Sequence, residues 1–226
     1  MTAMCLDAQL HTTAFEIDRG FVSHLQERFA REPEFRLVPG DCLKTMATEM
    51  RDSAAPEFVL GNLPYNVASQ IIWYLLGRAN GVRRLVLTIQ KEAADRMLAA
   101  ESSRSFGPLA ILCNLEYETR KIRTIPGECF YPRPQVTSTA IVLTRVRTVP
   151  HETKTAILAA ADAAFSARRK TLLNNFGKAL GDRPGAERRL TALGIDPSRR
   201  AESLRQADFL NLAEAFPELG QARMSS

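Results

Sequence analysis

The sequence predicts an α/β fold over residues 1–147, followed by a small all-helical domain over residues 151–226. In the first part, short apolar runs alternate with segments of helical periodicity, as in βαβ units that form a mostly parallel sheet. After Thr148-Val149-Pro150 the periodicity is helical throughout. The 226 residues, 45% of them hydrophobic, suffice for one medium and one small domain and exclude a wholly disordered chain.

The strands of the predicted sheet are short apolar runs bounded by turn residues. Four of them are expected at residues 12–17, 35–38, 57–60 and 84–89. Asp18 is placed to cap a helix after the first strand, and helices at 68–76 and 91–100 follow the third and fourth. Strands that alternate with helices in this way lie parallel, with helices on both faces of the sheet.

The sheet is expected to end in an antiparallel pair. Strand-like stretches near 110–122 and 135–146 have no helix of useful length between them, and a Pro-rich loop from Ile125 to Pro134 joins them. In the second domain, the periodicity predicts helices at 152–167, 169–180, 185–193 and 205–215.

Composition narrows the class of protein. The net charge of +5 suits a mildly basic enzyme as well as a nucleic-acid-binding protein. Four cysteines without a CxxC pair argue against a disulfide framework or a zinc site and indicate reduced thiols. No apolar run reaches 18 residues, and the N-terminus has no basic region followed by an apolar stretch. We therefore expect a cytoplasmic protein without a membrane span or signal peptide.

The most informative motif is Asn62-Leu63-Pro64-Tyr65, at the carboxyl end of a predicted strand, where open α/β sheets bind ligands. The exocyclic amine of adenine is a poor nucleophile because its lone pair is delocalised into the ring. The Asn62 oxygen and the Leu63 carbonyl can accept both N–H bonds and turn the lone pair toward an electrophile. Pro64 stiffens the loop without adding a donor. Tyr65 offers a face on which an unpaired base can stack, as base-modifying enzymes require.

The alternative for this motif is an ordinary strand-to-helix turn, in which Asn and Pro are common. The preceding strand, Gly61 and the following helix favour the adenine site.

Other stretches complete a resemblance that runs in order from about residue 1 to residue 215. They are FEIDR (15–19), Gly40-Asp41, GNLPYN (61–66), IQKEAADRML (89–98), SFGPLA (105–110), PGECFYPRPQVTS (126–138), AFSARRKTLLNNF (164–176) and LGIDPSRRAESL (193–204). Together they resemble the ribosomal RNA adenine N6-dimethyltransferases, specifically the bacterial small-subunit (16S) enzymes.

The resemblance implies a Rossmann-like, S-adenosylmethionine-dependent methyltransferase sheet and no metal. It places Glu16 at the cofactor's ribose hydroxyls, Asp41 at its adenine amine, and Asn62 at both cofactor and target base. It assigns Phe130 to the second face of the flipped adenine, opposite Tyr65. Glu16 could instead be a helix cap, Asp41 a turn residue and Phe130 part of the core.

The resemblance also implies the substrate: two adjacent adenosines near the 3′ end of 16S rRNA, each dimethylated during ribosome biogenesis. The expected partner is the immature 30S subunit, and the expected state is a monomer. Two alternatives stay open. One is a 23S rRNA adenine N6-methyltransferase that confers macrolide resistance, and the other is a non-catalytic rRNA-binding assembly factor.

Arg168, Arg169 and Lys170 are adjacent cations, which cannot all lie on one helix face. We interpret them as contacts to rRNA phosphates, in keeping with the family block that contains them. A structural contact with the core domain is the alternative, and the sequence does not decide between the two.

The chain departs from the family chiefly in that the N-terminal arm and the Gly-rich loop after the first strand are missing from it; Pro108 and Thr137 are smaller departures that we expect not to affect the chemistry. In a doubly wound sheet that first strand is central. We therefore expect the strands at 12–17 and 57–60 to lack their shared partner, with unpaired backbone groups at both edges. The expected consequence is a chain that folds poorly and binds cofactor weakly.

Overall fold

The computed structural model describes residues 1–52, 56–77, 82–131 and 133–224. The strands are β1 (Thr12–Glu16), β2 (Phe35–Pro39), β3 (Phe58–Asn62), β4 (Arg84–Gln90), β5 (Tyr117–Ile125) and β6 (Ser138–Arg145). The helices are α1 (Thr2–Asp7), α2 (Arg19–Arg28), α3 (Cys42–Asp52), α4 (Ala68–Gly77), α5 (Lys91–Met97), α6 (Pro108–Glu116), α7 (His151–Phe165), α8 (Leu172–Leu180), α9 (Arg183–Ala192), α10 (Gln206–Ala215) and α11 (Pro217–Met224), with 3-10 turns η1 (Gly127–Cys129) and η2 (Ala201–Ser203).

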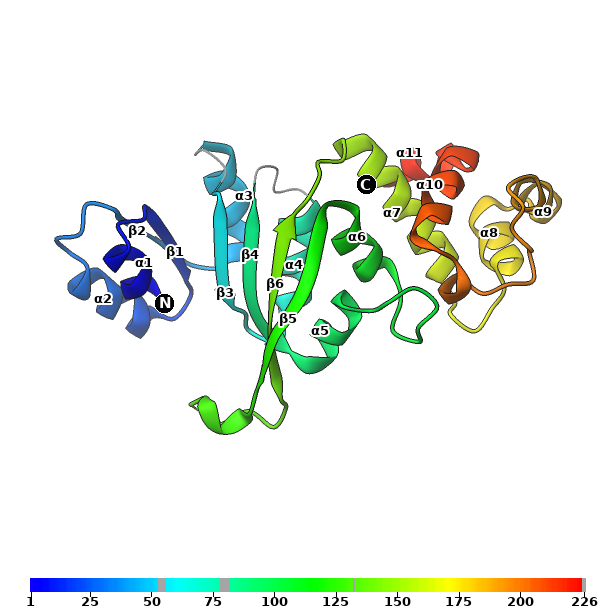
Figure 1. The fold of residues 1–226 in the computed structure, drawn as a ribbon. Helices are drawn as coiled ribbons and strands as arrows, with labels where there is room; N and C mark the ends of the chain where they lie inside the picture. The colour runs from blue at the N-terminus through cyan, green and yellow to red at the C-terminus, as the bar shows by residue number, and fades with distance from the viewer. Residues whose placement is uncertain (53–55, 78–81, 132, 225–226) are drawn as a thin grey trace.

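The strands form two separate sheets within the described part of the chain. β1 and β2 pair in parallel, and a second sheet has the order β3-β4-β6-β5. In that sheet β3 and β4 are parallel, whereas β6 runs antiparallel to both β4 and β5. Figure 1 shows β1 and β2 with α1 and α2 at one end of the molecule, beside the larger sheet. The expected antiparallel edge pair is confirmed, and β1 and β3 belong to separate sheets.

The predicted strand at 110–122 is wrong over residues 110–116. These residues belong to α6, and the strand begins only at Tyr117. Pro108 occupies the first turn of α6, where its fixed φ favours a helix. The run Ala110–Cys113 is fully buried, and a short run that is apolar on every side has no periodicity to distinguish helix from strand. α3 was likewise not expected from the sequence.

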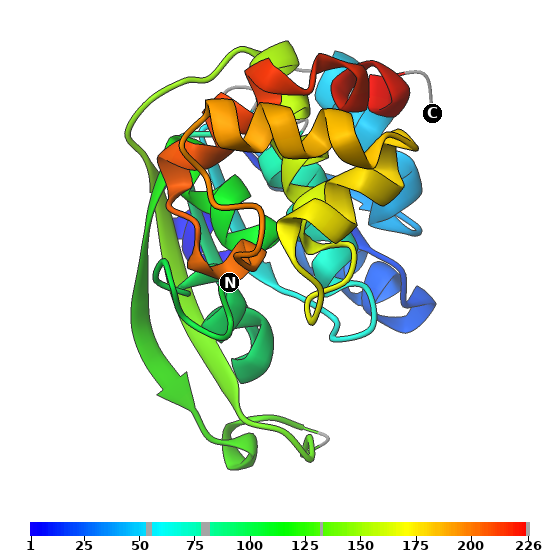
Figure 2. The same cartoon turned by 90° about the vertical axis from the view of Figure 1, so that its right-hand side faces the viewer.

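Two hydrophobic cores stabilise the molecule. The first lies between the four-stranded sheet and its helices and includes Ile72, Leu85 and Leu87. The second fills the helical region around Phe176 and Phe209, and it also takes in Ala99, Phe106, Ala110 and Ile111 of the first part of the chain. The helical region therefore packs directly on α6, and Figure 2 shows its helices in front of the sheet.

A buried ion pair joins the two regions. Lys154 of α7 and Glu116 of α6 are each 2% exposed. The Lys154 Nζ donates to Glu116 Oε2 at 2.5 Å and to the Leu76 carbonyl at 3.1 Å. The backbone N–H of Val149 donates to Glu116 Oε1 at 3.0 Å. These bonds satisfy both charges where water cannot reach them. No helix among the described residues is long and apolar enough to cross a membrane.

Candidate active site

The Asn62 loop leaves the carboxyl end of β3 and enters α4. The Leu63 N–H donates to the Thr88 carbonyl at 3.1 Å, and the Val67 N–H donates to the Pro64 carbonyl at 3.2 Å. Asn62 is exposed rather than buried in the core. Within the described chain, its carboxamide and the Leu63 carbonyl accept no hydrogen bond. Both predicted acceptors are therefore free for an incoming amine.

Tyr65 is held in place by a side chain from a distant strand. Its hydroxyl lies 2.7 Å from the hydroxyl oxygen of Ser138, the fully buried first residue of β6. This hydrogen bond ties the loop to β6 and fixes the direction of the half-buried Tyr65 ring. The sequence analysis missed Ser138, because a serine at a strand start carries no signal that points to a residue 73 positions earlier.

Phe130 follows η1 at the tip of the β5–β6 hairpin, where its N–H donates to the Gly127 carbonyl at 3.1 Å. The hairpin extends beyond the carboxyl ends of β3 and β4, as Figures 1 and 2 show. Phe130 is half-buried and outside both hydrophobic cores. Among the described residues no ring contact joins it to Tyr65. The structure thus places the hairpin that carries Phe130 at the same end of the sheet as the Asn62 loop.

A cavity of about 430 Å³ lies where β1 and β2 end. It is lined by Ile17, Arg19, Val22, Ser23, Pro39 and Gly40. The Gly40 N–H donates to the Glu16 carbonyl at 2.7 Å, which continues the pairing of the two strands. Gly40 has a φ of +117°, in the region that favours glycine. Glu16 and Asp41, which flank this turn, therefore lie at one edge of the small sheet.

Both carboxylates also stabilise their own loops. Glu16 Oε1 accepts from the N–H groups of Ile17 and Asp18, and Asp41 Oδ1 accepts from the Leu43 N–H at 3.0 Å. Asp18 caps α2, as expected, by accepting from a backbone N–H at 3.0 Å. Glu16 therefore stabilises the turn before α2 without capping that helix, and Asp41 stabilises the turn that leads into α3, in keeping with its turn-residue alternative. Each keeps a second oxygen that accepts nothing from the described residues.

These residues fit the nucleoside part of S-adenosylmethionine. Ile17, which is 66% exposed, and Val22 offer apolar surface to a base, while the two carboxylates can accept from ribose hydroxyls and an amine. The residues that line the cavity at Gly40 include neither the two carboxylates nor Asn62. The structure brings Glu16 and Asp41 to one turn at the end of the small sheet, whereas Asn62 ends a strand of the other sheet.

The cationic run splits into two environments. Arg168 donates to the carbonyls of Arg104 at 2.8 Å and Phe106 at 2.7 Å, and its guanidinium lies over the Phe165 ring. Arg169 and Lys170 are exposed. Arg168 thus makes the structural contact with the core that the sequence left open as an alternative.

Two thiols favour the neutral form. Burial and the neighbouring Asp41 raise the pKa of Cys42, and burial raises the pKa of Cys113 to about 12. A protonated thiol is a weak nucleophile, so neither side chain is prepared for covalent catalysis.

A family model described as ribosomal RNA adenine dimethylase matches residues 1–218. The chain belongs to the ribosomal RNA adenine dimethylase family. A "Ribosomal RNA small subunit methyltransferase A" from Treponema pallidum (strain Nichols) is 37% identical to it over 225 residues, which cover 97% of this chain and 78% of the relative. A protein of the same name from Syntrophotalea carbinolica is 37% identical over 211 residues, covering 92% and 77%.

Solved structures agree on the fold of this dimethylase. A dimethyladenosine transferase from Plasmodium falciparum superposes with a TM-score of 0.72 at 22% identity, covering 92% of this chain and 82% of the other. The 23S rRNA methyltransferase ErmE gives 0.60 at 20% identity, covering 91% and 81%. The predicted fold class, family and enzyme class are confirmed, and the cofactor of this methyltransferase family is S-adenosylmethionine, as predicted.

Proposed function

We propose that this dimethylase converts two adjacent adenosines near the 3′ end of small-subunit (16S) rRNA to N6,N6-dimethyladenosine during ribosome biogenesis. One observation carries the proposal: Asn62 is exposed beside a free Leu63 carbonyl, in a loop anchored through Tyr65. The relatives named small subunit methyltransferase A favour the 16S substrate over a 23S site. The protein would act as a cytoplasmic monomer on the immature 30S subunit.

The chemistry rests on two acceptors at one amine. The Asn62 oxygen and the Leu63 carbonyl each accept an N–H bond, which turns the nitrogen lone pair out of the ring plane and stabilises the positive charge that develops on nitrogen. Tyr65 stacks on one face of the extruded base, and Phe130 covers the other. S-adenosylmethionine supplies a methyl group made electrophilic by its sulfonium. After the first methylation one N–H remains, so only one acceptor stays engaged.

The other site residues serve binding. Glu16 would accept from the ribose hydroxyls of the cofactor and Asp41 from its adenine amine, each through the oxygen that its own loop leaves unused. Arg169 and Lys170 would contact rRNA phosphates, and Arg168 would hold their segment on the core. In this proposal, residues 1–147 are the catalytic domain and residues 151–226 the RNA-binding domain.

The proposal is tested by Asn62→Ala, with Asn66→Ala, an exposed asparagine of the same loop, as the control. Radioactive methyl transfer to 30S subunits that lack the modification is expected to fall by about 10²–10³ in Asn62→Ala only. rRNA binding in a gel shift is expected to stay unchanged in both variants.

Two results would contradict the proposal. Methyl transfer that survives in Asn62→Ala would remove its central residue. Binding of rRNA by the unmodified protein without any transfer would favour the non-catalytic assembly factor. Primer extension across 16S and 23S rRNA identifies the modified site and separates the two enzyme alternatives.

A further inference from the structure

A second cavity, of about 330 Å³, lies outside the residues assigned so far. It is lined by Gln90, Lys91, Glu92, Asp95, Val136 and Thr137. Its volume is at the lower end of the roughly 300–1,000 Å³ typical of small-molecule sites. It therefore suits a ligand of about the size of one nucleobase.

The cavity adjoins the proposed target-base site through two links. Gln90 ends β4, two residues after Thr88, which pairs with Asn62 across β3 and β4. Thr137 precedes Ser138, whose hydroxyl holds Tyr65. The Lys91 N–H donates to the Thr137 carbonyl at 2.9 Å and joins the two walls. A strand of RNA whose adenosine enters the Asn62 loop would bring a neighbouring nucleotide to this cavity.

The charges of the lining favour a base over a phosphate. Lys91 Nζ is 2.7 Å from Asp95 Oδ2, and Glu92 pairs with Arg96 at the same distance. The Lys91 cation is thus committed to a neighbouring carboxylate rather than free to bind phosphate.

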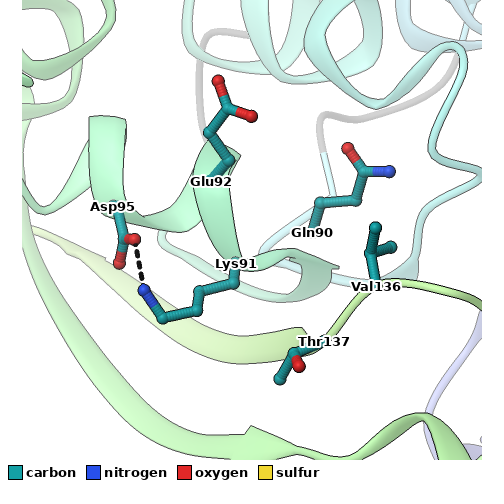
Figure 3. A pocket seen from close by; sticks show the side chains of 6 residues that line it. All are labelled: Gln90, Lys91, Glu92, Asp95, Val136 and Thr137. Carbon is teal, nitrogen blue, oxygen red and sulfur yellow. Dashed lines mark hydrogen bonds and ion pairs between the residues drawn. The ribbon is translucent and has the colours of Figure 1, made fainter.

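Figure 3 shows Lys91 running toward Asp95, whereas the Gln90 carboxamide extends the other way, above Val136. Within the described chain, the Gln90 carboxamide has no hydrogen-bond partner. Val136 is 42% exposed and offers an apolar wall.

We propose that this cavity binds the nucleobase next to the methylated adenosine and that Gln90 selects adenine there. A carboxamide carries a donor and an acceptor at the spacing that matches adenine N7 and N6, which makes glutamine a bidentate reader of this base. Val136 packs against the face of the base. This inference rests on the proposed function, because it takes the Asn62 loop as the site of the first base.

The test uses short single-stranded RNAs that carry one target adenosine and have adenine or cytosine beside it, on either side. Binding is measured by fluorescence anisotropy and methylation by radioactive transfer. The unmodified protein is expected to bind the adenine-flanked RNA about tenfold more tightly than the cytosine-flanked RNA. Gln90→Ala should reduce this ratio to near one, whereas Gln70→Ala, at an exposed glutamine of α4, should keep it.

Gln90→Glu preserves the shape of the side chain but removes its donor, so it should also lose the preference while the fold is retained. A ratio that is unchanged in Gln90→Ala, or absent from the unmodified protein, overturns the inference. The two proposals separate because binding and transfer are read independently. A Gln90-dependent preference in binding supports the cavity whether or not the short RNA is methylated. Methyl transfer to 30S subunits, measured with Asn62→Ala, decides the proposed activity separately.

Discussion

Lys154→Met tests whether the buried ion pair fastens the helical region to the sheet. The methionine fills the space of the lysine stem but leaves Glu116 charged and 2% exposed. Removing one partner of a buried pair costs about 3–5 kcal/mol. Glu116 retains the Val149 N–H at 3.0 Å and has Arg145 at 3.9 Å, so we expect the lower end, about 3 kcal/mol. For a chain of this size, that lowers Tm by roughly 6–12 °C.

The assay is urea unfolding followed by circular dichroism, with Lys178→Met, at an exposed lysine of α8, as the control. The control should stay within about 0.5 kcal/mol of the unmodified protein. The double variant Lys154→Met/Glu116→Gln removes both charges and keeps an acceptor for Val149, so it should recover more than half of the loss. If Lys154→Met lost less than about 1 kcal/mol, or if the double variant were no better, the ion pair would not fasten the two regions.

Four further results are expected. Arg168→Ala should lower the unfolding free energy by about 2 kcal/mol, because it removes two hydrogen bonds to backbone carbonyls. Arg169→Ala should leave the unfolding free energy unchanged and weaken rRNA binding in a gel shift, and the opposite pattern would contradict the two environments. Iodoacetamide at pH 8, followed by mass spectrometry, should label exposed Cys129 first and leave Cys113 unmodified. Burial raises the pKa of Cys113 to about 12, so little of its thiolate is present at pH 8, and equal labelling rates would refute this. Hydrogen exchange should be faster in β1 and β2 than in β4 and β6, because Val38 is the one buried residue in 1–41; equal protection would show that the small sheet is as stable as the large one. Calorimetric titration should show weak binding of S-adenosylmethionine, because the carboxylates of Glu16 and Asp41 and the Asn62 loop lie at the ends of separate sheets; micromolar affinity would contradict this.

The sequence predicted most elements of this fold because their signals are local. The strand before Asn62 is a short apolar run, and Asp18 caps α2 as its position before the helical pattern implied. The residues around Asn62 were also recognisable, since an acceptor, a proline and an aromatic stand together at a strand end. Their proximity in space could be predicted because they are adjacent in the sequence, and no tertiary contact is needed to bring them together.

Contacts between distant residues had no such signal. Lys154 lies within a helix whose apolar positions are conspicuous, and nothing in the periodicity identifies Glu116, 38 positions earlier, as its partner. The same holds for Tyr65 and Ser138, and for Arg168, whose cationic run suggested solvent or RNA but which bonds the carbonyls of residues 104 and 106. Burial converts such side chains from surface groups into structural ones, and burial depends on the assembled fold.

The division of the sheet connects these observations to the chemistry. The proposed cofactor carboxylates lie on β1–β2, and the proposed amine acceptors lie at the end of β3, on the other sheet. Ile17, which follows β1, and Leu60, in the middle of β3, are 66% and 47% exposed. Apolar side chains left in water and strand edges without partners both cost stability. Because methyl transfer needs donor and amine in fixed alignment, the position of one sheet relative to the other sets the position of the two half-sites.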